Sequence, residues 1–118
     1  LLTESENATD QLRYSLVGYP ANVRVALGDT GASHSPIIGW AYDGNPIYGS
    51  YGYTTSNDEN STIGIITSSY KSNAANIVDR PVGFSTGFFV EDYAFDASGD
   101  LDESNGRYCK TPDFPNGI

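Results

Sequence analysis

Turn-forming residues interrupt this chain every few positions, and the apolar runs between them are short. Gly, Ser, Asn, Asp and Thr recur throughout the 118 residues. This spacing is typical of short strands joined by turns. We therefore predict a mainly β fold: a single small β-rich domain over residues 1–118, with long irregular loops and little helix. Residues 1–21 are assigned to an N-terminal extension of that domain.

Local patterns predict where the strands lie. In residues 22–27, Val23, Val25 and Leu27 alternate with other residues, which predicts a half-buried strand. The apolar run 36–42 leads into the turn-forming residues 43–46, which predicts a β-hairpin or a sharp chain reversal. The remaining predictions are an extended segment at 47–53, a polar loop at 56–61, a strand within 62–70, one helical turn near 73–78, an extended segment at 87–95 and a last strand at 107–111.

Acidic side chains dominate the charge, with fifteen against six basic ones and a net charge of −9. Such a surface repels phosphate backbones and anionic lipid, so we expect no nucleic-acid partner. No apolar run reaches roughly 18 residues, so no membrane insertion is expected. Cys109 is the only cysteine and cannot form a disulfide within the chain. Because the chain begins with Leu1 and contains no methionine, we expect a fragment of a longer chain.

The tetrapeptide Asp29-Thr30-Gly31-Ala32 matches the turn that presents the catalytic carboxylate of aspartic proteases. Such an enzyme needs two carboxylates sharing one proton. A chain of this length supplies one, so only a homodimer using Asp29 would qualify. The residue before Asp29 is Gly28, where that motif usually has an apolar residue. The alternative is an ordinary turn in which Asp29 and Thr30 bond nearby backbone N–H groups.

Two later blocks carry a more specific pattern. Residues 34–49 read HSPIIGWAYDGNPIYG and residues 101–107 read LDESNGR. Together they resemble the signature of the YHYH-domain family. Residues 87–93 and 111–117 resemble a variant of that family found in large structural proteins of marine phages. The resemblance covers roughly residues 34–118.

The chain departs from the family pattern at three places. Ser50 stands where the family usually has proline, and Ser104 replaces a frequent cysteine, so no disulfide is expected there. The Tyr-His-Tyr-His tetrapeptide that names the family is not in the sequence. The resemblance implies kinship of fold and a structural setting in a virion. It implies no particular reaction.

The two blocks also contain residues that could carry chemistry. A divalent cation such as calcium would suit the oxygen ligands of Asp43, Asp102 and Glu103, with His34 and Asn105 nearby in the pattern. The alternative is structural: the two aspartates cap turns and Glu103 pairs with Arg107. A hydrolase triad of His34, Asp43 and one of the serines 33 and 35 has the right residue types but no nucleophile-elbow pattern. A buried histidine with satisfied nitrogens is the simpler interpretation.

Aromatic residues cluster in the same stretch. Their faces, beside acidic and amide groups, could form a platform on which a sugar stacks. Alternatively they pack the core, which we favour because Leu, Val and Ile are scarce. The residues are Trp40, Tyr42, Tyr48, Tyr51 and Tyr53.

These observations favour a non-enzymatic structural or attachment domain of a virion-associated or extracellular protein. The expected partners are other structural subunits or a cell-surface glycan, and the domain could form a homo-oligomer. One alternative is a metal-dependent or acid/base enzyme centred on His34, Asp43 and nearby carboxylates. The third is the homodimeric aspartic protease that uses Asp29.

Overall fold

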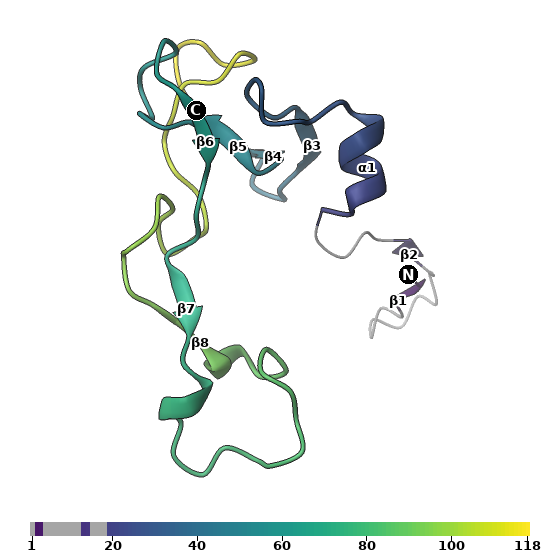
Figure 1. Cartoon of the computed structure of the whole chain (residues 1–118), viewed down its shortest axis with the longest axis vertical. Helices are drawn as coiled ribbons and strands as arrows, with labels where there is room; N and C mark the ends of the chain where they lie inside the picture. Colours follow the sequence, from purple (N-terminus) through teal and green to yellow (C-terminus); the bar gives the residue numbers. More distant parts are fainter. Residues whose placement is uncertain (1, 4–12, 15–18) are drawn as a thin grey trace.

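The computed structural model describes residues 2–3, 13–14 and 19–118. In this part of the chain, strands of two to four residues pair antiparallel into four separate two-stranded sheets, joined by long loops (Figure 1). The predicted mainly β fold with little helix is thus confirmed. In chain order the elements are β1 (Leu2–Thr3), β2 (Arg13–Tyr14), α1 (Ala21–Ala26), β3 (Ile37–Trp40), β4 (Pro46–Tyr48), β5 (Tyr51–Tyr53), β6 (Ile63–Ile65), β7 (Tyr70–Ser72) and β8 (Tyr93–Phe95), with 3₁₀ turns at Ala74–Asn76 and Val90–Asp92.

The strand predicted at residues 22–27 is wrong, because this segment forms α1. Pro20 at the N-cap position has φ −60°, the value that a proline ring favours, and the Pro20 carbonyl accepts the first helical bond from Arg24 N. Gly28, with φ +66°, ends the helix in the left-handed conformation that glycine adopts without strain. A strand here would need a partner for its backbone groups, whereas the helix bonds its own.

The hairpin predicted from residues 36–53 is confirmed. β3 pairs with β4, with Trp40 opposite Pro46 and an irregularity between Ile37 and Gly39. The turn closes because Ala41 N donates to Asn45 O at 2.8 Å, and Asp43 Oδ1 accepts a bond from Asn45 N at 3.0 Å. This is the bond by which aspartate favours a turn over a continuing strand.

The later segments follow the predictions in part. The strand predicted within residues 62–70 forms as the shorter β6, which pairs with β5 across the predicted polar loop. The helical turn expected near residues 73–78 is the 3₁₀ turn at Ala74–Asn76. Residues 87–95 are extended only at β8, and residues 107–111 form no strand. Residues 107–111 form no strand because their backbone bonds go to separate segments. Lys110 N donates to Ser56 O, and Cys109 N donates to Ile118 O.

No apolar side chain is buried in the described part of the chain that has side-chain placements, residues 19–118. The buried side chains there are polar, those of Asp29, Ser35, Ser69, Asp92 and Thr111, and Gly52 is buried as well. The prediction that aromatic rings form the core is therefore wrong for Trp40, which is 58% exposed, and for Tyr42, which is fully exposed.

Polar bonds also join the two ends of the structure. Figure 1 shows β3–β6 with the C-terminal segment at one end, and β7 and β8 toward the other. Between them, Asp100 Oδ2 accepts bonds from Thr67 N and Thr67 Oγ1, both at 2.8 Å, and Ser69 Oγ donates to Leu101 O. These hydrogen bonds connect the segments that carry the candidate sites.

Candidate functional site

A cluster of hydroxyl and carboxylate groups lies where α1 leads into β3. Asp29 is 6% exposed and Ser35 is 2% exposed. Ser35 Oγ lies 2.9 Å and 2.8 Å from the two carboxylate oxygens of Asp29, to which it donates. Tyr19 Oη donates to Asp29 Oδ2 at 2.8 Å, and Ser35 Oγ accepts a bond from Tyr51 N at 2.9 Å. The cluster thereby links residues from before α1, after α1, and the start of β5.

Gly49 closes this cluster on one side. A Cβ placed on Gly49 would lie 2.8 Å from both Ser35 Oγ and Tyr19 Cε1, and closer still to Asp29 Oδ2. Side-chain Cβ atoms do not tolerate such approaches, so this position requires glycine. Burial of the Tyr19 ring and its bond to Asp29 raise the pKa of the Tyr19 hydroxyl. The hydroxyl therefore stays protonated as the donor.

The predicted turn at residues 29–32 forms differently from the expectation. Asp29 bonds side-chain hydroxyls rather than backbone N–H groups of its own turn. The Ser35 and Tyr19 hydroxyls bond the carboxylate within one copy of the chain, and a homodimer in which two Asp29 carboxylates share a proton stays a prediction. The protease prediction gains no support from this arrangement.

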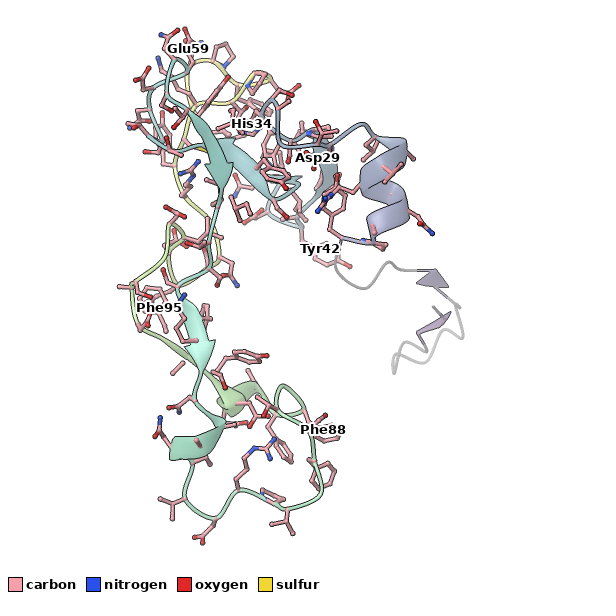
Figure 2. All side chains as sticks on the ribbon, viewed as in Figure 1. Asp29, His34, Tyr42, Glu59, Phe88 and Phe95 are labelled. Atoms are coloured by element: carbon pink, nitrogen blue, oxygen red, sulfur yellow. The ribbon has the colours of Figure 1, made fainter. Side chains whose placement is uncertain are left out.

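His34 lies near Asp29 (Figure 2), and two tyrosine rings contact its imidazole. Its ring centroid lies 4.9 Å from that of Tyr48 and 5.1 Å from that of Tyr53, both edge-on. Nδ1 lies 2.8 Å from the backbone carbonyl of Ser35, to which it donates as the N–H tautomer. In the neutral ring, Nε2 is then the atom with a lone pair, which is the form a base or a metal ligand would use.

A hollow of about 300 Å³ opens beside His34. The C-terminal segment contributes Asp113 to the lining. Tyr48 Oη donates to Asp113 Oδ2 at 3.1 Å and lies 2.8 Å from Thr111 Oγ1. Burial raises the pKa of Tyr48, so its hydroxyl remains a donor over a wide pH range. The lining residues are Leu27, Gly28, Asp29, Ser33, His34, Ser35, Pro36, Pro112 and Asp113.

Asp43 and Asp102, predicted as cation ligands, each serve their own turn. The Asn45 backbone N–H holds the pKa of Asp43 below its usual value, and the Ser104 hydroxyl does the same for Asp102. Asp102 Oδ1 accepts from Ser104 Oγ at 2.6 Å and from Gly106 N at 3.1 Å. Both aspartates therefore cap turns, as the structural alternative to cation binding predicts.

Glu103 does not form the predicted pair with Arg107. Arg107 Nη2 donates instead to Tyr53 O at 2.6 Å, and the Glu103 carbonyl accepts a bond from Tyr70 Oη. Across residues 19–118, the structure brings no three His, Cys, Asp or Glu side chains close enough to hold a metal ion. A cation bound by Asp43, Asp102 and Glu103 stays a prediction.

The five aromatic residues predicted as a platform lie in three different surroundings. Tyr48 and Tyr53 flank His34, while Tyr51 lies under the Arg24 guanidinium, 5.9 Å from the ring centroid. Trp40 and Tyr42 lie on the surface, and the Trp40 ring meets Phe114 edge-on at 6.3 Å. A sugar-binding role for these rings stays a prediction.

A second polar centre lies at the far end of the molecule, and the sequence patterns did not predict it. Asp92 is fully buried and accepts bonds from Arg80 Nε at 2.6 Å and Arg80 Nη2 at 2.8 Å. The N–H groups of Gly87 and Phe89 donate to the same carboxylate. The Arg80 guanidinium and these N–H groups hold the pKa of Asp92 well below its usual range. This ion pair closes the loop between residues 80 and 92. We call residues 77–92 the apolar loop.

The apolar loop presents its large side chains outward. Phe84, Phe88 and Phe89 form a ring cluster with centroids 4.6 to 5.3 Å apart, and the Arg80 guanidinium lies 5.3 Å from the Phe89 centroid. Figure 2 shows Phe88 at the opposite end of the molecule from Asp29 and His34. The exposed apolar residues of the loop are Val78, Val82, Phe84, Phe88 and Val90.

Comparison with known proteins identifies a family. The family model described as YHYH protein matches residues 5–118, which extends the resemblance seen in the two sequence blocks toward the N-terminus. No curated protein and no solved structure matches the chain. A search of the described residues for helices able to cross a membrane found none.

Proposed function

The chain belongs to the YHYH protein family, and from that premise we propose that it is a non-enzymatic structural domain of a larger assembly. One observation carries the proposal: residues 19–118 bury no apolar side chain. Apolar burial is the dominant favourable contribution to folding, so a domain whose apolar side chains are at most half-buried gains stability by covering its surface with other protein. A subunit of an assembly has such neighbours.

The exposed apolar residues are spread over the molecule, which supports contacts with several neighbours. Val25 on α1 is 79% exposed, Ile65 on β6 is 63% exposed, and Tyr108 near the C-terminus is 66% exposed. Scattered single apolar residues are normal on a protein surface. Here, however, no apolar interior accompanies them.

The finer proposal places the assembly in a virion or outside the cell. It is supported by residues 87–93 and 111–117, which resemble the variant of the family found in structural proteins of marine phages. Other structural subunits are then the expected partners. The net charge of −9 suits contact with basic surfaces and disfavours nucleic acid.

Hydrogen–deuterium exchange on the isolated chain and on the full-length protein in its assembly tests the proposal. We expect amides of β5 and β6 to exchange quickly in the isolated chain and slowly in the assembly, because neighbours cover these strands. An isolated chain that is monomeric, equally protected, and hydrolytically active would overturn the proposal.

Attachment to a glycan is a second candidate, favoured by the exposed ring of Trp40 beside the β3–β4 turn. Sugar rings stack on exposed aromatic faces, and Trp offers the largest face. Glycan-array binding that Trp40→Ala removes and Tyr108→Ala preserves would support this role. Equal binding by both variants would refute it.

The enzyme alternative has less support. Asp43 is engaged in its own turn, and His34 donates to a backbone carbonyl. Turnover of any ester or glycoside substrate that His34→Ala abolishes while the fold is retained would establish it.

A further inference from the structure

We propose that the apolar loop (residues 77–92) is a docking surface for a different polypeptide whose apolar face has a basic rim. This inference rests on the proposed assembly function and names one partner surface within it. No segment of similar length among residues 19–118 that lies outside the loop exposes as many large apolar side chains. Exposed fractions are 85% for Val78, 94% for Val82, 44% for Phe84, 63% for Phe88 and 84% for Val90.

The loop is held in place without packing these side chains inward. Arg80 Nη1 donates to Phe84 O at 3.0 Å, and Arg80 Nη2 donates to Ser85 O at 2.9 Å as well as to Asp92. The buried Asp92 carboxylate in turn accepts the N–H groups of Gly87 and Phe89. A loop ordered by its own polar centre loses little conformational entropy when a partner binds.

The loop offers a set of large exposed apolar groups. Val78, Val82 and Val90 are each more than four-fifths exposed, and the Phe84 and Phe88 ring centroids lie 4.6 Å apart. A standard protein interface covers about 800 Å² on each partner, so a partner would cover the backbone of the loop as well as these side chains.

The charges around the loop select the partner. Asp79 and Glu91 are exposed, whereas Arg80 is committed to Asp92 and to two loop carbonyls. The charges left to the rim are therefore negative. A second copy meeting this face with the same face would oppose Asp79 and Glu91 to like charges, on a chain of net charge −9. A partner with Lys or Arg around an apolar centre fits both features.

Binding of the whole chain to a synthetic amphipathic helical peptide of about 18 residues, with leucine on one face and lysine along the rim, tests the inference. The same peptide with glutamate in place of lysine is the control. Fluorescence anisotropy at about 0.15 M salt limits non-specific attraction. We expect the lysine peptide alone to bind.

Matched variants separate the loop from the general acidity of the chain. Phe88→Ser should weaken binding about tenfold or more, whereas Ile65→Ser, an equally exposed site elsewhere, should not. Asp79→Asn with Glu91→Gln should weaken binding more than Asp58→Asn with Glu59→Gln, which removes the same charge from the polar loop. Equal effects within either pair, or dimerisation through the loop, would overturn the inference.

The same exchange experiment on the assembly distinguishes this inference from the proposed function. If β5 and β6 become protected but the apolar loop does not, the assembly role stands and the docking surface is refuted. If nothing becomes protected, the assembly role itself fails.

Discussion

Replacing Ser35 by alanine removes the hydroxyl at the centre of the Asp29 cluster. Ser35 Oγ donates to the Asp29 carboxylate and accepts from Tyr51 N, and the side chain is 2% exposed. Alanine leaves both partners in place, so the variant keeps the backbone and loses only these bonds.

The size of the effect follows from the partners left behind. A hydrogen bond to a charged group contributes about 1.5–3 kcal/mol, and an unsatisfied buried donor costs about 1–3 kcal/mol. Water entering from the neighbouring hollow offsets part of the loss. We therefore expect Ser35→Ala to lower the free energy of unfolding by about 2–4 kcal/mol.

Urea denaturation followed by the fluorescence of Trp40, the single tryptophan, measures this loss. With a slope of about 1–2 kcal/mol per molar urea, the midpoint should fall by about 1–4 M. The neighbouring Ser33→Ala is the control, because Ser33 is exposed and the expected change is within about 0.5 kcal/mol. A midpoint for Ser35→Ala no lower than that of Ser33→Ala would refute the structural role of the cluster.

Gly49→Ala should destabilise the same cluster by about 1–3 kcal/mol through overpacking. The control is Gly39→Ala, which should be tolerated because its Cβ would meet nothing closer than 3.9 Å. Thermal unfolding measures the stability of both variants. The folded-state pKa of Asp92 is lowered, so its stabilising effect is fully present above the unfolded value of about 4 and is lost as pH falls toward the folded value. The protection factors of amides in the apolar loop, which are corrected for the intrinsic pH dependence of exchange, should therefore be constant from about pH 5 to 8 and fall below about pH 4. Asp92→Asn should lower these protection factors at every pH, and unchanged protection in that variant would contradict the ion-pair role. Because Asp43 and Asp102 serve their own turns, calcium should change the unfolding temperature by less than about 1 °C. A calcium-dependent rise that Glu103→Gln removes would instead establish the cation predicted from the sequence.

Local turn chemistry made part of the fold predictable. Asp43 and its neighbours specify the β3–β4 turn through bonds within four residues, so the hairpin could be read from sequence. Alternation over residues 22–27 was too short to distinguish a strand from one and a half helical turns. Pro20 and Gly28, the start and stop signals of α1, favour the helix over the strand.

The Asp29 cluster and the Arg80–Asp92 ion pair could not be predicted from the sequence, because the partners of each aspartate come together only when the loops fold. Asp29 meets Tyr19 and Ser35, at separations of ten and six residues that belong to no motif. Arg80 pairs with Asp92 among fifteen acidic residues, and composition does not say which one. The sequence blocks singled out His34, whose functional role stays a prediction, but its tyrosine neighbours come from β4 and β5 only once the hairpin has folded.

An interior made of polar groups changes which substitutions the chain can bear. In most domains a mutational scan finds the least tolerant positions at Leu, Ile, Val and Phe. Here the intolerant positions should be small or hydrogen-bonding, such as Ser35, Gly49 and Asp92, while Val82 and Val25 accept many replacements in the isolated chain. In the assembled particle the apolar positions should no longer tolerate replacement. A scan of the isolated chain compared with a scan of the particle would therefore map the contacts between subunits.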